Sequence, residues 1–402
     1  ARDAGQQLPA RSQSDTRSPS HGEERLIYFA NRSGTFMPTR VEHHLLRASL
    51  SADAIAVRAS FDEWKASVDL NDVEYGSLRL LPLLYRNLQK HGIDDAIMPR
   101  LKGIYRNAWV RNQLVVEHGL RAMRALREQG IASIVLKGAS LVADGSYAEL
   151  ALRPMEDFDL LVAPDEFRRA VDVLRDCGWN FHPASVEPEW YLPYRHAVAF
   201  RNGSGELDLH WASIRDRFDG DEAFRRGAVD AKLLGEDVRV LSPADQLLQA
   251  CGHASARNVD VAPIRWVADV WFLLAKHGES FDWQRVVSGA RDRDLSFAVL
   301  RCLEYLHVGL GAGIPLEVLL ELERNSGIGS RISLKLRNSY GPAIYAYVLS
   351  VWLRLALAKP YRGIPRRVAL LPKYVRFYFR LPQDASLMRF VAKKLRARLA
   401  PA

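Results

Sequence analysis

The sequence predicts an α+β protein in which a small mixed sheet, within residues 131–240, is flanked by N-terminal and C-terminal helical regions. Three observations support this fold class. Apolar residues recur at helical spacing before residue 130, short apolar runs separated by turn residues follow, and helical spacing returns after residue 241. With 402 residues and 48% apolar side chains, the chain is long enough to bury a sizeable core.

The N-terminal part of the chain divides into two segments. Residues 1–24 are polar and rich in Ser, Arg and Gln, without the apolar run of a secretory signal, and are predicted to be disordered. Residues 40–130 are predicted to form a helical region. Pro82 suits the first turn of a helix, and Gly130 is a typical residue for ending one.

The pattern changes at residue 131, where the predicted sheet begins. Residues 131–136 and 158–162 are short apolar runs of the kind found in buried strands. A helix is predicted from Pro164 to Cys177, because Pro favours the first turn and Gly178 provides a stop. Strands alternating with helices over this length indicate a small α/β unit.

Residues 241–350 are predicted to form a second helical domain. Ser242 is a favourable N-cap and Pro243 a favourable first residue for its first helix. The three cysteines have neither the spacing of a zinc site nor that of a disulfide framework, and are expected to be buried free thiols in a reducing cytosol. The longest apolar run, residues 343–358, is short for a membrane span and contains Arg354, so a cytoplasmic location is expected.

Residues 351–402 form a basic tail. Thirteen Lys and Arg against one acid give it a net charge of +12, which leaves −3 for residues 1–350 out of a total of +9. Because the main part of the chain is slightly acidic, this distribution disfavours nucleic acid as a partner of the whole protein. Three interpretations of the tail stay open: a solvated helical face, peripheral contact with an anionic membrane, and binding of RNA or an acidic partner.

Two carboxylates one residue apart are the first candidates for chemistry. Asp157 and Asp159 frame Phe158 at the start of an apolar run, and a strand would project both acids from the same face. Nearby carboxylates repel each other, and a hard divalent cation such as Mg²⁺ relieves that repulsion. The pair is therefore a candidate metal site, although a solvated edge strand is the alternative interpretation.

A predicted hairpin supplies a third carboxylate. Residues 197–201 and 206–211 read as two strands joined by a turn of Asn, Gly and Ser. Alternation places Asp208 and His210 on one face of the second strand. If this strand pairs with residues 158–162, Asp208 approaches the first two acids, where it could bind metal and take a proton from an acceptor hydroxyl.

A short turn ahead of the acids is a candidate phosphate site. Gly138 permits close approach of the backbone, Ser140 offers a hydroxyl, and Lys137 can neutralise phosphate charge. The segment is not a P-loop, because the Walker pattern is absent. Arg153, just before the acids, is either a phosphate contact or one half of a structural salt bridge.

The order of these motifs resembles a known family. Leu-Lys-Gly at 136–138, Arg-Pro at 153–154 before Asp-Phe-Asp-Leu-Leu-Val, and Leu-Asp-Leu-His-Trp at 207–211 are similar to the uncharacterised nucleotidyltransferase family of bacterial biosynthetic and polysaccharide loci. That family belongs to the polymerase-β-like nucleotidyltransferase superfamily. Gln-Leu-Leu at 246–248 and Ile-Arg-Trp-Val-Ala-Asp at 264–269 look like its helical continuation, and the resemblance spans about residues 40–390.

The resemblance implies roles for specific residues. Asp157 and Asp159 match the metal-binding pair of the superfamily and Asp208 its third carboxylate, which makes these three the implied catalytic residues and metal ligands. Gly138 and Ser140 occupy its Gly-Ser position beneath the triphosphate. Two departures affect this position: Ala139 separates the glycine from the serine, and the distance in sequence from Ser140 to Asp157 is longer than in many members.

The implied activity is transfer of a nucleoside monophosphate from a nucleoside triphosphate to a small-molecule, sugar or peptide acceptor. Two Mg²⁺ ions are implied as cofactors, with in-line attack on the α-phosphate and pyrophosphate as the leaving group. The alternative is a catalytically inactive relative that serves as a binding or scaffold protein, held at a membrane by its basic tail. A transferase acting on RNA ranks last, because residues 1–350 are net acidic.

Overall fold

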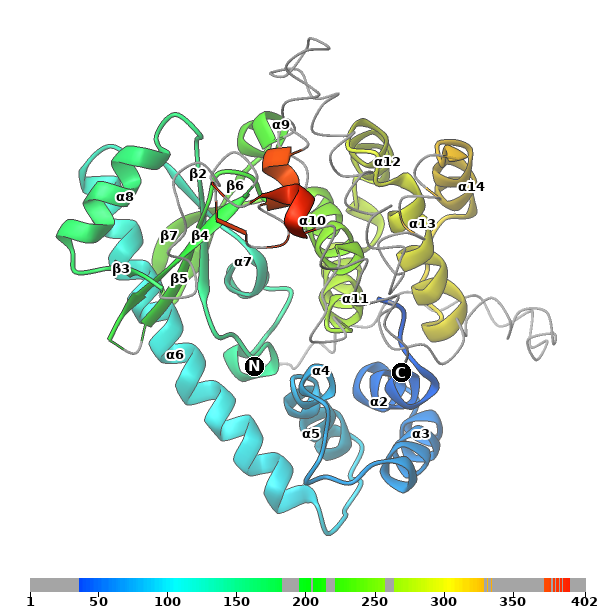
Figure 1. The fold of residues 1–402 in the computed structure, drawn as a ribbon. Coiled ribbons are helices and arrows are strands. Elements are labelled where there is room, and N and C mark those ends of the chain that lie inside the picture. Colours follow the sequence, from blue (N-terminus) through cyan, green and yellow to red (C-terminus); the bar gives the residue numbers. More distant parts are fainter. Residues whose placement is uncertain are drawn as a thin grey trace.

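The computed structural model describes residues 36–182, 195–203, 205–214, 221–256 and 264–328, with short pieces between 331 and 390. The predicted disordered segment 1–24, the end of the predicted helical domain up to residue 350, and most of the basic tail 351–402 lie outside the described residues. Figure 1 shows a sheet with helices on either side, followed by a separate group of helices. The predicted fold class, a mixed sheet with flanking helices, is confirmed.

Five helices precede the sheet: α2 (Arg40–Leu50), α3 (Ala54–Ser67), α4 (Tyr75–Leu78), α5 (Leu81–Lys90) and α6 (Met98–Glu128). Pro82 lies in the first turn of α5, and Gly130 follows α6 with φ of +72°. Both residues therefore act as predicted. Helix α6 is the longest of the five and runs along one face of the sheet (Figure 1).

The sheet has seven strands in the order β3-β4-β5-β2-β1-β7-β6. Their bounds are β1 (Ser133–Val135), β2 (Phe158–Val162), β3 (Asn180–Phe181), β4 (Ala197–Asn202), β5 (Gly205–His210), β6 (Val229–Leu233) and β7 (Glu236–Val240). The pairs β2–β5 and β1–β7 are parallel and the others antiparallel, so the sheet is mixed as predicted. The predicted hairpin is the β4–β5 pair.

Three short helices connect strands of the sheet, and a second group of helices follows the last strand. The connecting helices are α7 (Lys137–Ala143), α8 (Phe167–Asp176) and α9 (Asp221–Arg226), with a 3₁₀ turn at Leu150–Leu152. The second group of helices comprises α10 (Pro243–Ser255), α11 (Trp266–His277), α12 (Trp283–Asp292), α13 (Ser296–Glu304) and α14 (Leu316–Arg324). The Ser242 hydroxyl accepts a hydrogen bond from the Asp245 backbone N–H, which confirms it as the N-cap of α10.

The two faces of strand β2 pack into different cores. Phe158, Leu160 and Val162 are fully buried against apolar side chains of α6 and α8. Leu161, on the opposite face, joins the core that includes α10 and the later helices. Because side chains alternate along a strand, Asp159 projects to the same side as Leu161, toward the second group of helices.

Close packing of α6 on β2 makes a glycine necessary at position 119. A Cβ built there would overlap the ring of Phe158, which is fully buried and has no free space to move into. We expect Gly119→Ala to lower the free energy of unfolding by about 2 kcal/mol, because overpacking outweighs the gain in helix propensity. Chemical denaturation monitored by circular dichroism measures this change.

Gly103 provides the matched control, since it lies in the same helix and a Cβ there meets no atom within 4 Å. Gly103→Ala is expected to leave stability unchanged or raise it by up to about 1 kcal/mol. Equal effects of the two substitutions would contradict the packing described here.

Three features differ from the predictions. Helix α8 begins at Phe167 instead of Pro164, because residues 164–166 form a turn ahead of it. The β6–β7 hairpin was not predicted, because its turn is Leu234-Gly235, both with positive φ, rather than an Asn-Gly or Asp-Gly pair. The three cysteines are free, but Cys177 is exposed instead of buried. Among the described helices, none combines the length and the apolar character needed to cross a membrane.

Candidate active site

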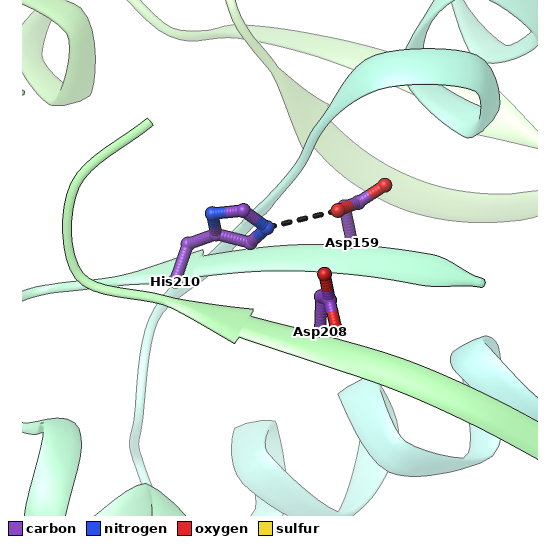
Figure 2. A group of neighbouring side chains, drawn as sticks. All are labelled: Asp159, Asp208 and His210. Carbon is purple, nitrogen blue, oxygen red and sulfur yellow. Dashed lines mark hydrogen bonds and ion pairs between the residues drawn. The ribbon is translucent and has the colours of Figure 1, made fainter. Parts of the chain in front are cut away.

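Two of the predicted acids lie side by side on neighbouring strands. Strands β2 and β5 pair in parallel with Asp159 directly opposite Asp208, so the condition for Asp208 to approach the first acids is met. Asp159 is buried, with 3% of its surface exposed, whereas Asp208 is half-buried. The two carboxylates project from the same face of the sheet (Figure 2).

Asp157 lies just outside the strand. Strand β2 spans Phe158–Val162 as predicted, but Asp157, which was expected to share a strand face with Asp159, occupies the bend that leads into it. Burial and the neighbouring Asp159 carboxylate raise the pKa of Asp157 to about 6. A carboxyl group whose ionisation is opposed by neighbouring carboxylates would be stabilised in its charged form by a bound cation.

Asp159 is the centre of a small polar network. Its Oδ1 atom lies 2.5 Å from the Lys137 ammonium and 2.8 Å from His210 Nε2. Burial alone would raise the pKa of Asp159, but Lys137 and His210 hold it well below its usual range. The carboxylate is therefore ionised and shared between two partners.

Three side chains form a group that could bind a metal ion. Asp159, Asp208 and His210 each offer a ligand atom, and these atoms lie within 4.8 Å of one another. His210 is fully buried, and its Nδ1 atom has no hydrogen-bond partner among the described residues. Carboxylate oxygens suit Mg²⁺, so the donor set fits the implied ion, with an imidazole beside it. His210 replaces Asp157 in this group relative to the implied triad.

Residues 137–140, the glycine turn, pack closely against neighbouring side chains. A Cβ at Gly138 would fall 2.8 Å from the Met155 side chain, so only glycine fits without a shift. Ser140 lies inside α7 and is buried, and its hydroxyl is 2.9 Å from both the Lys137 carbonyl and Gln246 Oε1. The structure thus places Ser140 where α7 meets α10.

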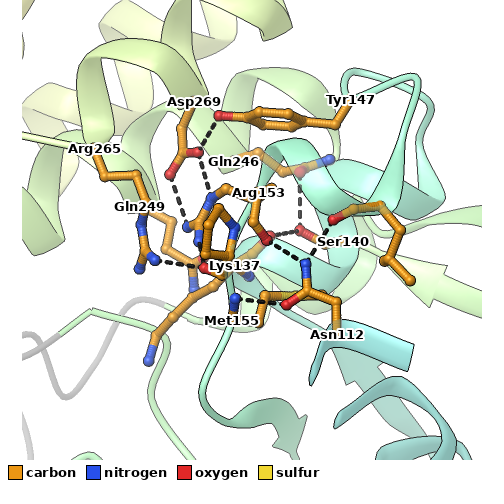
Figure 3. Close-up of polar contacts among 12 residues, drawn as sticks. Asn112, Lys137, Ser140, Tyr147, Arg153, Met155, Gln246, Gln249, Arg265 and Asp269 are labelled. Carbon is orange, nitrogen blue, oxygen red and sulfur yellow. Dashed lines mark hydrogen bonds and ion pairs between the residues drawn. The ribbon is translucent and has the colours of Figure 1, made fainter. Parts of the chain in front are cut away.

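Arg153 is held in a buried ion pair. Its Nε and Nη2 atoms donate to the two oxygens of Asp269 on α11 at 2.6 and 2.9 Å. The Tyr147 hydroxyl donates to the same carboxylate at 2.8 Å (Figure 3). Of the two interpretations of Arg153, the structural salt bridge is present, and it ties the segment before the acids to the second group of helices.

Asn112 on α6 fixes the same segment from the other side. Its amide nitrogen donates to the carbonyls of Leu150 and Arg153 at 2.6 and 2.9 Å, and its oxygen accepts from the Met155 N–H at 2.8 Å. The side chain is completely buried. Nothing in the sequence near residue 112 indicates this role, because all three partners are about forty residues away.

A cavity of about 300 Å³ opens beside this network, lined by residues of helices α4, α7, α10 and α11 and of the segment before β2. Its lining includes four cationic side chains, Arg79, Lys137, Arg153 and Arg265. The Arg265 guanidinium donates to the Pro154 carbonyl at 2.7 Å, and burial together with the nearby Arg153 and Arg79 lowers its pKa to about 9. Three of these cations have carboxylate partners: Glu156 for Arg79, Asp159 for Lys137 and Asp269 for Arg153. A bound anion would compete for these cations and would stabilise the charged form of Arg265.

Acidic side chains on adjacent strands beside a cation-lined cavity are typical of enzymes that handle nucleotide phosphates. A family profile described as "Uncharacterised nucleotidyltransferase" matches residues 76–311, which is more than half of the chain. The protein belongs to this nucleotidyltransferase family.

The chain was also compared with curated proteins and with solved structures. No curated protein matches the sequence. The solution structure of the antibiotic-resistance factor ANT(2'')-Ia is similar at 16% sequence identity with a TM-score of 0.32, covering 48% of this chain and 98% of that one. The matched family region contains the acids, the glycine turn and most of the cavity lining.

Proposed function

We propose that the protein is a Mg²⁺-dependent nucleotidyltransferase that transfers a nucleoside monophosphate from a nucleoside triphosphate to a small-molecule, sugar or peptide acceptor. The observation that supports this most strongly is the placement of Asp159 and Asp208 opposite each other, next to a cavity lined by cations. The carboxylates would bind the metal ions, and the cationic side chains of the cavity would bind the phosphates. These two halves of the site, the acids and the cavity, adjoin where a triphosphate would lie.

The chain's own residues supply positioning and charge. Asp157, Asp159 and Asp208 would hold two Mg²⁺ ions, which when bound neutralise charge on the phosphates and act as Lewis acids. Arg79, Arg265 and Lys137 would bind the phosphate oxygens. Phosphoryl-group transfer needs mainly alignment and charge neutralisation, and fixed side chains on packed strands and helices provide both.

Proton transfer in this proposal falls to Asp208. It is half-buried and opposite Asp159, so one carboxylate oxygen can face an incoming hydroxyl group. The acceptor oxygen would then attack the α-phosphorus in line with the bond to pyrophosphate. Gly138 contributes close backbone packing, and Ser140 and Arg153 support the cavity wall through Gln246 and Asp269.

One observation favours the second candidate, a catalytically inactive binding or scaffold protein. The Lys137 ammonium already neutralises Asp159, as a cation would in a site that no longer binds metal. The suggested membrane attachment through the basic tail lies outside the described residues. A single pair of measurements separates the two candidates.

Isothermal titration of the full chain with each of the four nucleoside triphosphates, with and without Mg²⁺, tests binding. A screen with α-labelled nucleotides against sugar, peptide and small-molecule acceptors then tests transfer. Mg²⁺-dependent nucleotide binding with label transfer supports the enzyme. Nucleotide binding without any transfer, or no nucleotide binding at all, rules out the enzyme as stated and favours the inactive binding or scaffold protein.

The raised pKa of Asp157 predicts how metal binding depends on pH. Below pH 6 its carboxylate is protonated, and the proton must leave before a metal ion can bind. Apparent Mg²⁺ affinity is therefore expected to fall by about tenfold per pH unit below 6 and to level off above about pH 7. Mg²⁺ titrations between pH 5 and 8 measure this profile. Asp157→Asn should flatten it, and an unchanged slope in that variant would assign the titration to another group.

A further inference from the structure

We propose that Lys137 couples metal binding to nucleotide binding, by occupying Asp159 until the phosphates of the nucleotide draw its ammonium away. This inference rests on the proposed function and specifies how that site is regulated. It assigns Lys137 a role beyond charge neutralisation, because the same side chain would decide whether Asp159 is available to a metal ion.

Lys137 lies at the border of the two halves of the site. Its ammonium is 2.5 Å from Asp159 Oδ1, and its side chain also lines the cation-rich cavity. The side chain is 20% exposed, so a short rotation toward the cavity is open to it, whereas Asp159 is 4% exposed and fixed on β2. A single flexible ammonium thus lies within reach of both the carboxylate and any phosphate in the cavity.

The backbone of Lys137 is fixed by hydrogen bonds, whereas its side chain can point either to Asp159 or into the cavity. Its φ is +52°, a conformation that is uncommon and costly for a residue other than glycine. The Lys137 N–H donates to Gln249 Oε1 at 3.3 Å, and its carbonyl accepts from Ser140, so helices α7 and α10 maintain this geometry. Strained backbone of this kind is concentrated at functional sites, where it aims a side chain.

The competition follows from elementary electrostatics. The ammonium and a divalent cation compete for the same carboxylate. A metal ion on either oxygen of Asp159 would lie close to the Lys137 ammonium on Oδ1, and the repulsion between the two cations opposes their binding together. A triphosphate offers Lys137 a stronger anion and removes the competitor. Linkage then requires the reciprocal effect: metal bound at Asp159 leaves Lys137 available and raises affinity for the nucleotide.

Several other charged or titratable groups face this contact. Asp157 and Asp208 add negative charge that attracts Lys137, and His210 shares Asp159 Oδ1 with it. His253, Arg265, Arg79, Arg153 and Glu156 line the same cavity. Because His210 remains on Oδ1 when Lys137 departs, Asp159 keeps its orientation. The exchange therefore changes the charge at the site and not the position of the acid.

The test compares Lys137→Asn with the unmodified protein, since Asn is the uncharged residue that, after glycine, best tolerates positive φ. Mn²⁺ affinity is measured by electron paramagnetic resonance without nucleotide, and ATP affinity by calorimetry in EDTA and again with Mn²⁺. We expect Lys137→Asn to bind Mn²⁺ alone at least tenfold more tightly and ATP alone at least tenfold more weakly. Mn²⁺ should also enhance ATP binding less than in the unmodified protein; chelation of Mn²⁺ by ATP is common to both proteins and cancels.

Arg265→Met is the matched control, because Arg265 lines the same cavity but does not contact Asp159. It should weaken ATP binding while changing Mn²⁺ affinity less than threefold. Lys137→Met is measured in parallel as a second variant, and circular dichroism checks that each variant is folded.

Each outcome bears on one proposal. Unchanged or weaker Mn²⁺ binding in both Lys137 variants, with ATP still bound by the unmodified protein, overturns the coupling and leaves the proposed function intact. Absence of ATP binding in the unmodified protein, with Asp159→Asn having no effect on Mn²⁺, overturns the proposed function itself. An equal gain in Mn²⁺ affinity in Arg265→Met would show a general charge effect and would also overturn the coupling.

Discussion

Asp159→Asn is expected to reduce nucleotidyl transfer by at least about 10³-fold, because the substitution removes the buried negative charge that would bind the metal. That factor corresponds to a loss of about 4 kcal/mol of transition-state stabilisation. The measurement is the rate of α-label transfer at saturating nucleotide, once an acceptor has been found. Asp208→Asn should show a loss of similar size, since the two carboxylates lie directly opposite each other.

Asp165→Asn is the control for this experiment. Asp165 is exposed in the turn after β2, away from the cavity lining, and its substitution should leave the rate unchanged. Because Asp159 also pairs with Lys137 and His210, thermal unfolding of Asp159→Asn must be recorded beside the rate. A folded Asp159→Asn variant with the full rate of transfer would be incompatible with the proposed site.

Arg153→Met is expected to lower the free energy of unfolding by about 3 to 5 kcal/mol. The substitution leaves the Asp269 carboxylate buried with Tyr147 as its remaining hydrogen-bond donor among the contacts described. An uncompensated buried charge is far more costly than the loss of a surface ion pair. Urea denaturation followed by tryptophan fluorescence measures the change.

The double variant Arg153→Met with Asp269→Asn separates a structural role from phosphate binding. It removes the unpaired charge and keeps an acceptor for the Tyr147 hydroxyl, so at least half of the lost stability should return. If Arg153→Met instead kept full stability but lost nucleotide affinity, the guanidinium would act mainly on the phosphates. The cavity-facing position of Arg153 makes both measurements necessary.

The sequence predicted the strands that carry the acids and the face that Asp208 shares with His210, because both follow from local rules. The pairing of the two strands was only a condition of the prediction, since it depends on residues far apart in the chain. Alternation with period 2 places Asp208 and His210 on one face, and apolar residues at 158, 160 and 162 define the buried face of β2. The glycine turn was recognised for the same reason, since Gly138 lies in the first turn of the helix that follows a strand.

The remaining parts of the site depend on contacts between distant residues. Arg153 and Asp269 are 116 positions apart, and no period or spacing relates them. Asn112 meets its partners only after α6 packs beside the segment before β2. The position of Lys137 on Asp159 was not predicted either, because it depends on a backbone with positive φ, which sequence patterns associate with glycine.

The distribution of these partners along the chain has a consequence for the order of protein synthesis. Asp159 and Asp208 leave the ribosome before Gln246, Gln249 and Asp269, which hold the glycine turn and the segment before β2. Domains generally fold from the N-terminal end as they emerge. A nascent chain that has reached residue 256 therefore carries every acid of the site but lacks the ion pair that secures it, so the site is completed only when helix α11 has been made.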